Sequence, residues 1–173
     1  MRKLLIAALI GFSGFAHAQT MSEKEVTPAL VAQREIQKKE VTNHYLALKN
    51  NFIISDSVAA SQNAKALVAS FNKFKFKKLT LQKMNEATIM RKEIVQLATE
   101  ISATKDINRQ RKAFSLLSTK FLAIADKLKP ADMPLYEQVC PMTGDVWVSE
   151  SKEIKNPYFP KNMLTCGEVK ASL

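Results

Sequence analysis

Apolar residues recur at alternating spacings of three and four along four stretches of the chain, and this periodicity constrains the fold more than any other feature. Such spacing places the apolar side chains on one face of a helix. The four sets are Val41/Tyr45/Leu48/Phe52, Ala60/Ala64/Leu67/Phe71/Phe74, Ala87/Met90/Ile94/Leu97/Ile101 and Phe114/Leu117/Phe121/Ile124/Leu128. Four amphipathic helices on short connections predict an all-α fold, with a four-helix bundle over residues 35–130.

Polar and basic residues mark the boundaries of these helices. Ser55-Asp56-Ser57 and Asp106 offer side-chain oxygens that cap the second and fourth helices, and Pro130 ends the fourth. The connection at residues 73–83 interleaves lysines with two phenylalanines. This pattern favours a solvated loop whose rings are tucked inward, with contact to an anion or a membrane surface as the alternative.

The chain begins with a segment typical of a secretory signal peptide. Basic residues precede a short apolar run from Leu4 to Phe15, and Ala16-His17-Ala18 follows. We therefore expect removal of residues 1–18, cleavage before Gln19 and a flexible lead-in over residues 19–34. The mature protein would be periplasmic or secreted, and no later stretch is apolar enough for a membrane span.

The net charge of the chain excludes few functional classes. The sequence holds 26 basic and 16 acidic residues, a net charge of +10. Loss of Arg2 and Lys3 with the signal peptide would leave 24 basic residues and a net charge of +8. Because an exported chain rarely meets nucleic acid, we expect no nucleic-acid partner and interpret the charge as a solvated, lysine-rich surface.

Residues suited to catalysis are scarce. His44 is the one histidine outside the expected signal peptide, and a serine or cysteine nucleophile normally needs a neighbouring base. The chain has four glycines, no glycine-rich phosphate loop and no HExxH pattern. We therefore expect a protein that is not an enzyme.

The composition changes after Pro130, where four of the six prolines and both cysteines are found. Residues 131–173 are too few and too polar for a core of their own, so we expect an irregular cap packed on the bundle. Within this cap, Leu135–Val139 and Val146–Val148 flank a Thr143-Gly144-Asp145 turn and are spaced for a short β-hairpin.

Two pairs of sulfur residues lie in this cap, Cys140 with Met142 and Met163 with Cys166. Thiolate and thioether ligands select copper(I), so the four side chains form a candidate soft-metal site. The methionines could equally fill gaps against the aromatic residues. Two cysteines in an exported chain also predict a Cys140–Cys166 disulfide, which would stabilise the fold by about 3 kcal/mol. Spacing alone favours the disulfide, and a bonded cysteine supplies no thiolate to a metal.

The segments CPM, EIKNPYF, ML and CGEV, with Trp147 after the first, resemble the ending of an uncharacterised family of exported helical domains. That family also occurs as a C-terminal extension of periplasmic adaptor (membrane-fusion) subunits of heavy-metal efflux pumps. The similarity runs roughly from Val41 to Val169 and includes YLALKNNFIISDSVAASQNAKAL and RQRKAFSLLSTKF. It implies a helical bundle carrying the sulfur-bearing tail, with copper(I) or silver(I) as ligand and a component of a metal efflux system as partner.

The resemblance also assigns motif residues and exposes two departures. The motif positions are Cys140, Pro141, Met142, Trp147, Asn156, Pro157, Tyr158, Met163, Cys166 and Gly167. Many relatives place a histidine where this chain has Val139, and glycine where it has Pro160. If that histidine is a metal ligand in the relatives, the site here has one ligand fewer.

Arg111 lies on the apolar stripe of the fourth helix, three residues before Phe114. A buried guanidinium needs hydrogen-bond acceptors. We expect either that Arg111 binds carbonyl groups of the cap and pins the tail to the bundle, or that its stem extends to solvent. Together these features predict an exported, non-catalytic, metal-associated protein, with a disulfide-stapled interaction module as the alternative.

Overall fold

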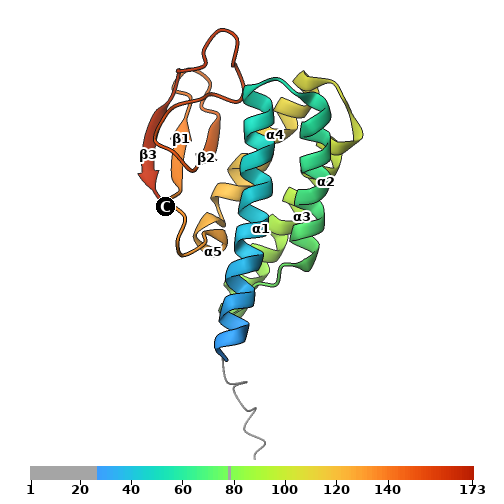
Figure 1. The fold of residues 1–173 in the computed structure, drawn as a ribbon, viewed down its shortest axis with the longest axis vertical. Helices are drawn as coiled ribbons and strands as arrows, with labels where there is room; N and C mark the ends of the chain where they lie inside the picture. The colour runs from blue at the N-terminus through green and yellow to red at the C-terminus, as the bar shows by residue number, and fades with distance from the viewer. Residues whose placement is uncertain (1–26, 78) are drawn as a thin grey trace, which may run out of the picture.

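The computed structural model describes residues 27–77 and 79–173 (Figure 1). The expected signal peptide, and residues 19–26 of the expected lead-in, lie outside the described residues. The elements are α1 (Pro28–Ile53), α2 (Ser57–Lys73), α3 (Leu81–Ala103), α4 (Ile107–Leu122), α5 (Ala125–Leu128), β1 (Tyr136–Val139), β2 (Val146–Ser149) and β3 (Glu168–Ser172). A mostly helical chain with a small C-terminal cap is thus confirmed.

Side-chain caps fix where the helices begin. The Asp56 carboxylate accepts hydrogen bonds from the amides of the first turn of α2, and Asp106 does the same for α4. Thr27 caps α1 and Pro28 occupies its first turn, where the missing amide proton costs nothing. Helix α1 therefore starts inside the range 19–34 that the sequence suggested as a lead-in.

The fourth predicted stripe is split between two helices. Helix α4 ends at Leu122, and the amide of Ile124 bonds to the carbonyl of Phe121 at 3.1 Å, which tightens the backbone before α5 begins. Ile124 and Leu128 are nevertheless buried, so the apolar stripe remains continuous across the break. Pro130 follows α5 rather than α4.

The core follows the predicted stripes closely. Every residue of the four sets is buried except Met90 and Leu97, which are half-buried. An aromatic column joins α1 to α4, with the ring of Tyr45 stacked 4.0 Å from that of Phe121 and 5.6 Å from that of Phe114. Burial of this apolar surface supplies the main stabilisation of the bundle.

The cap is a three-stranded antiparallel sheet of order β2-β1-β3. Strands β1 and β2 form the expected hairpin, whereas β3 was not expected. Figure 1 shows the sheet on one side of the bundle, opposite α2 and α3. Trp147 and Val148 of β2 are fully buried, and the rings of Trp147 and Phe114 lie 6.0 and 5.8 Å from that of Tyr158. Among the described helices, none is both long and apolar enough to cross a bilayer.

Candidate sulfur site in the C-terminal cap

The pairing of β1 with β3 brings the two cysteines together. Val139 at the end of β1 lies opposite Glu168 at the start of β3. Cys140 directly follows β1 and Cys166 comes two residues before β3, so both sulfurs lie at the same end of this strand pair. Their Sγ atoms are 3.8 Å apart, in contact but without a bond between them.

A tight turn wraps the backbone around the sulfur of Cys140. The carbonyl of Cys140 accepts a hydrogen bond from the Gly144 amide at 2.8 Å, and the Cys140 amide donates to the carbonyl of Asp145 at 2.9 Å. Gly144 has a φ of +75°, the left-handed conformation that glycine adopts most easily. The amides of Met142 and Thr143 belong to this turn and act on the Cys140 sulfur, where they favour its charged form.

These donors favour the thiolate form of Cys140. Burial by itself raises the pKa of this thiol, but hydrogen bonds from the Thr143 side chain, from the two amides and from Cys166 outweigh it, so the pKa is lowered. The Thr143 hydroxyl also lies 2.7 Å from Oδ2 of Asp145. Because the hydroxyl has a single proton, Thr143 donates either to Asp145 or to Cys140 and not to both at once.

Cys166 has the opposite tendency. Burial, the hydrogen bond to Cys140 and the negative charge of that neighbour together raise the pKa of the Cys166 thiol. Cys140 is therefore the thiol of the pair that ionises more readily, and Cys166 is the thiol that keeps its proton longer. Cys140 is fully buried and Cys166 half-buried, so Cys166 is the side from which solvent reaches the pair.

Asn156 holds the segment that carries Cys166. Its side-chain amide donates to the Cys166 carbonyl at 3.0 Å, and its own backbone amide donates to the carbonyl of Leu164 at 2.7 Å. Its Oδ1 accepts from the amide of Tyr158 at 2.9 Å. Asn156 is fully buried, and these bonds satisfy its polar groups while fixing the loop before β3.

Trp147 forms a platform beneath the residue next to Cys166. A Cβ atom on Gly167 would lie 2.9 Å from Cη2 of Trp147 and 2.7 Å from Cγ2 of Ile154, so the backbone packs closely against both side chains. Trp147 Nε1 donates to Oε1 of Gln138 at 2.6 Å, and the Tyr158 hydroxyl donates to the Val146 carbonyl at 2.6 Å. These bonds allow both aromatic residues to be buried without leaving a polar group unpaired.

Arg111 connects the bundle to the cap. Its Nε donates to the carbonyl of Pro157 at 3.0 Å, and its Nη2 donates at 2.8 Å to the carbonyl of Phe52 and to Oγ of Ser55. The Phe52 carbonyl belongs to the last turn of α1, where carbonyl groups lack a partner within the helix. One guanidinium thus ties α4, the end of α1 and the cap together, as the pinning role requires.

The methionines of the predicted ligand set are placed less closely than the cysteines. Met142 is 73% exposed and Met163 is half-buried. Over residues 27–77 and 79–173, no three His, Cys, Asp or Glu side chains come close enough to hold one metal ion. The donor set at this point is therefore two thiols, with thioethers carried on the adjoining backbone.

Sequence reasoning missed several residues that position the site. Gln138, fully buried, accepts from Trp147 and donates to the Ser151 carbonyl at 2.8 Å, while Asp145 accepts from Ser115 of α4 and anchors the Cys140 turn. The alternation of a strand could have placed Gln138 inward, because Tyr136 and Gln138 share a face. Nothing in the sequence pairs Ser115 with Asp145.

Comparison with known proteins bears on the bundle and not on the cap. No curated protein and no solved structure matches this sequence. The family model described as a protein of unknown function (DUF3347) matches residues 41–132, from the middle of α1 to just beyond α5. This match covers more than half of the chain and stops before β1. The chain belongs to the DUF3347 family.

Proposed function

We propose that this protein binds a soft monovalent ion, copper(I) or silver(I), through Cys140 and Cys166, as an exported and non-catalytic accessory to metal handling or efflux. The observation that carries the proposal is the 3.8 Å separation of the two sulfur atoms in a rigid cap. Two thiolates that each lie about 2.3 Å from one tetrahedral metal ion are about 3.8 Å apart. The spacing therefore suits an ion that takes two further ligands, and the thioethers of Met142 and Met163 are the ones that we propose.

The donor set favours copper(I) over zinc. Structural zinc sites take four protein ligands and catalytic ones three. The described residues offer no third His, Cys, Asp or Glu beside the cysteines. Thiolates and thioethers are the soft donors that select copper(I), and Met142 and Met163 carry the only further sulfurs near the pair in sequence.

The hydrogen bonds around Cys140 support ligation as well. A metal-bound thiolate is stabilised by amide donors, which orient the ligand and offset its charge. The Met142 and Thr143 amides already supply these donors. Because Cys166 must lose its proton when an ion binds, affinity should rise with pH.

The role in efflux is supported by the sequence resemblance alone. The cap resembles an ending that also occurs on periplasmic adaptor subunits of heavy-metal efflux pumps, and the expected signal peptide would send the chain to the same compartment. A component of such a system is accordingly the partner that we propose.

Titration of the reduced protein with copper(I) against a competing chelator tests the metal site. Binding should require both cysteines, so the Cys140→Ser/Cys166→Ser double variant should lose it. Met142→Leu with Met163→Leu should weaken copper(I) binding if the thioethers are ligands. Met84→Leu with Met90→Leu, which also removes two thioethers but in α3, should leave it unchanged. Unchanged affinity in the double serine variant would remove the proposal.

A disulfide-stapled module that binds another protein is the second candidate, and the same sulfur separation favours it. A thiolate beside a thiol is the reactant pair for disulfide formation once an oxidant removes two electrons. This candidate predicts no free thiol in protein isolated from its native compartment and a marked fall in melting temperature on reduction.

A further inference from the structure

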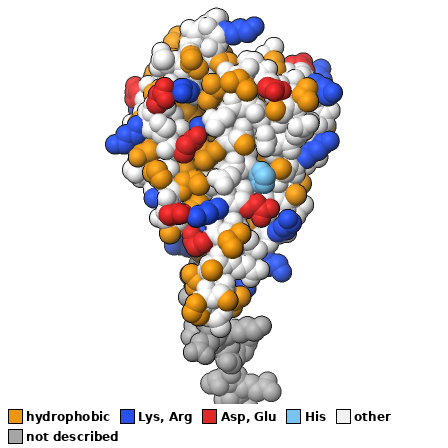
Figure 2. All heavy atoms as spheres, viewed as in Figure 1, with side chains coloured by type: hydrophobic (Ala, Val, Ile, Leu, Met, Phe, Trp, Pro, Cys, Tyr) orange, Lys and Arg blue, Asp and Glu red, His pale blue; other side chains and the backbone are white. Residues whose placement is uncertain are grey.

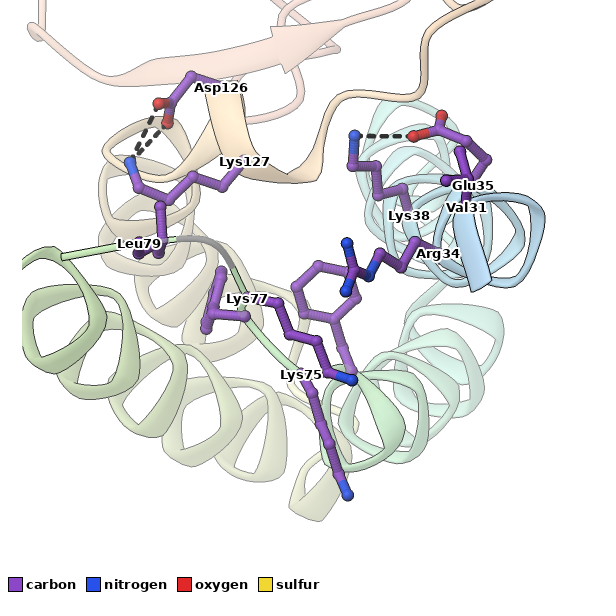
Figure 3. Close-up of a pocket in the computed structure, with 11 residues that line it drawn as sticks. Val31, Arg34, Glu35, Lys38, Lys75, Lys77, Leu79, Asp126 and Lys127 are labelled. Atoms are coloured by element: carbon purple, nitrogen blue, oxygen red, sulfur yellow. Dashed lines mark hydrogen bonds and ion pairs between the residues drawn. The ribbon is translucent and has the colours of Figure 1, made fainter. Parts of the chain in front are cut away.

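The end of the molecule where α1 begins carries a hollow that the sulfur site does not use (Figure 3). Its volume is about 510 Å³, and α1, the connection between α2 and α3, and α5 form its walls. The basic side chains that line it are Arg34, Lys38, Lys75, Lys77 and Lys127, and the acidic ones are Glu35 and Asp126.

Two of these five cations are neutralised locally. Lys38 pairs with Glu35 at 2.8 Å and Lys127 pairs with Asp126 at 2.9 Å, and Figure 3 shows these two ion pairs on opposite sides of the hollow. No carboxylate of the described residues is in ion-pair contact with Arg34, Lys75 or Lys77. The hollow therefore has a surplus of positive charge.

A second hollow of about 280 Å³ shares these three cations. Arg34, Lys75 and Lys77 line both hollows, and Lys73 with Gln33 and Gln37 completes the polar lining of the second. These three cations therefore lie where the two hollows adjoin. This arrangement can contact more than one anionic group at a time.

Apolar side chains accompany the charges. Phe74 and Phe76 are buried, 5% and 9% exposed, with their rings edge to face at 5.1 Å, so they anchor the connection while Lys75 and Lys77 face solvent. Val31 on the wall is 47% exposed and Leu81, at the start of α3, is 78% exposed. Figure 2 shows hydrophobic side chains gathered on the projecting end of the molecule, next to the grey residues.

We propose that this end docks on a bilayer that contains anionic phospholipid, with Arg34, Lys75 and Lys77 against the headgroup phosphates and Val31 and Leu81 in the interface. A free phosphate would satisfy the cations and leave the exposed apolar side chains in water. An anionic bilayer takes up both kinds of group, because long basic side chains reach the phosphates while short apolar ones enter the interface. This inference goes beyond the metal site and does not depend on it.

Co-sedimentation with phosphatidylglycerol vesicles, compared with phosphatidylcholine vesicles, tests the proposal on protein purified after export. The partition coefficient on the anionic vesicles should fall on the order of 100-fold in the Arg34→Gln/Lys75→Gln/Lys77→Gln variant. It should also fall with added salt. The matched control is Lys65→Gln/Lys92→Gln/Lys161→Gln, which removes the same charge from exposed positions on α2, α3 and the cap and should lose far less.

Three results would overturn the proposal. The first is absence of binding to anionic vesicles at low salt, and the second is an equal loss in the control variant, which would mean a non-specific effect of net charge. The third is calorimetric binding of inorganic phosphate that requires the same three residues and displaces the protein from vesicles, which would mark a site for free anions. Unchanged circular dichroism of both variants confirms that folded proteins are compared.

Discussion

At the scale of single residues, Gly167 leaves no room for a side chain, because an added Cβ atom would lie within 3 Å of the buried Trp147 ring and of Ile154. We predict that Gly167→Ala destabilises the protein by about 1–3 kcal/mol, since the added methyl group must displace Trp147 or Ile154 from a close-packed position. Urea denaturation measures the loss. The variant should also bind copper(I) more weakly, because Cys166 precedes this residue.

Gly144→Ala is the matched control for that substitution. Gly144 has a φ of +75° and nothing lies within 4 Å of an added Cβ atom, so the cost there is backbone strain alone, about 1 kcal/mol. If Gly144→Ala proves the more damaging of the two changes, the close contact of Gly167 with Trp147 does not govern the cap.

The sequence predicted the identity of the sulfur residues but not the state of each. Two cysteines in a short tail can be paired from composition, and the structure places their sulfurs in contact. That Cys140 ionises more easily than Cys166 depends on which amides of the 140–145 turn act on the sulfur. Such contacts follow from backbone geometry, which the residue types alone do not determine.

At the scale of elements, Arg111 joins the bundle to the cap. We predict that Arg111→Lys costs about 1–3 kcal/mol, because an ammonium group cannot reach the carbonyls of Pro157 and Phe52 and the Ser55 hydroxyl in the same planar arrangement. Hydrogen exchange should show the loss as faster exchange at residues 156–166.

Arg109→Lys, two residues earlier on the same helix, is the control for Arg111. The Arg109 side chain is 80% exposed and pairs only with Asp106 at 3.6 Å, so its replacement should cost a few tenths of a kcal/mol. Equal stability losses at the two positions would show that Arg111 acts through helix propensity or charge and does not pin the cap.

The elements that sequence reasoning found are those with one buried face. The four stripes predicted the helices of the bundle because core packing demands apolar residues every three to four positions. Strand β3 could not be predicted, because its residues are mostly exposed and backbone pairing to β1 holds it in place. Its sequence therefore lacks the alternation of apolar and polar residues that marks a half-buried strand. The first turns of α1 escaped for the same reason, since residues 28–33 are largely exposed.

At the scale of the whole molecule, an ion pair between a buried lysine and a partly exposed glutamate links the bundle to the cap. Lys49 of α1, 4% exposed, donates to Oε2 of Glu150 at 2.8 Å and to Oγ of Ser149 at 3.1 Å. Burial raises the pKa of the Glu150 carboxyl, but the hydrogen bond and charge of Lys49 outweigh it, so the pKa is lowered. The pair therefore stabilises the fold above the unfolded pKa of about 4.3, and its contribution is lost as pH falls through the lower folded pKa.

We predict that Glu150→Gln destabilises the protein by about 1–2 kcal/mol at neutral pH, a modest loss because the Glu150 side chain is 41% exposed and partly screened. The difference from wild type should narrow below pH of about 4, where the wild-type carboxylate is protonated too. Urea denaturation over a series of pH values measures this. Glu153→Gln, which alters an exposed pair with Lys155, is the control, and a gap independent of pH would contradict the assignment.

The state of the cysteine pair decides between the two candidate functions for the protein as a whole. If the protein holds a soft metal ion, no disulfide joins its cysteines in the cell. An alkylating reagent that is present from cell lysis until the metal has been removed should then modify two cysteines in each chain. Oxidation in vitro should then close the loop between Cys140 and Cys166, stabilise the fold by about 3 kcal/mol and raise the melting temperature by about 6–12 °C. The same oxidation should abolish copper(I) binding, because no thiolate remains. Cys166→Ser, which cannot form the bond, should show no such rise.

Chains isolated from cells without a free thiol would reverse the order of the two proposals. The disulfide would then be the native state, and copper(I) would bind only to the reduced protein.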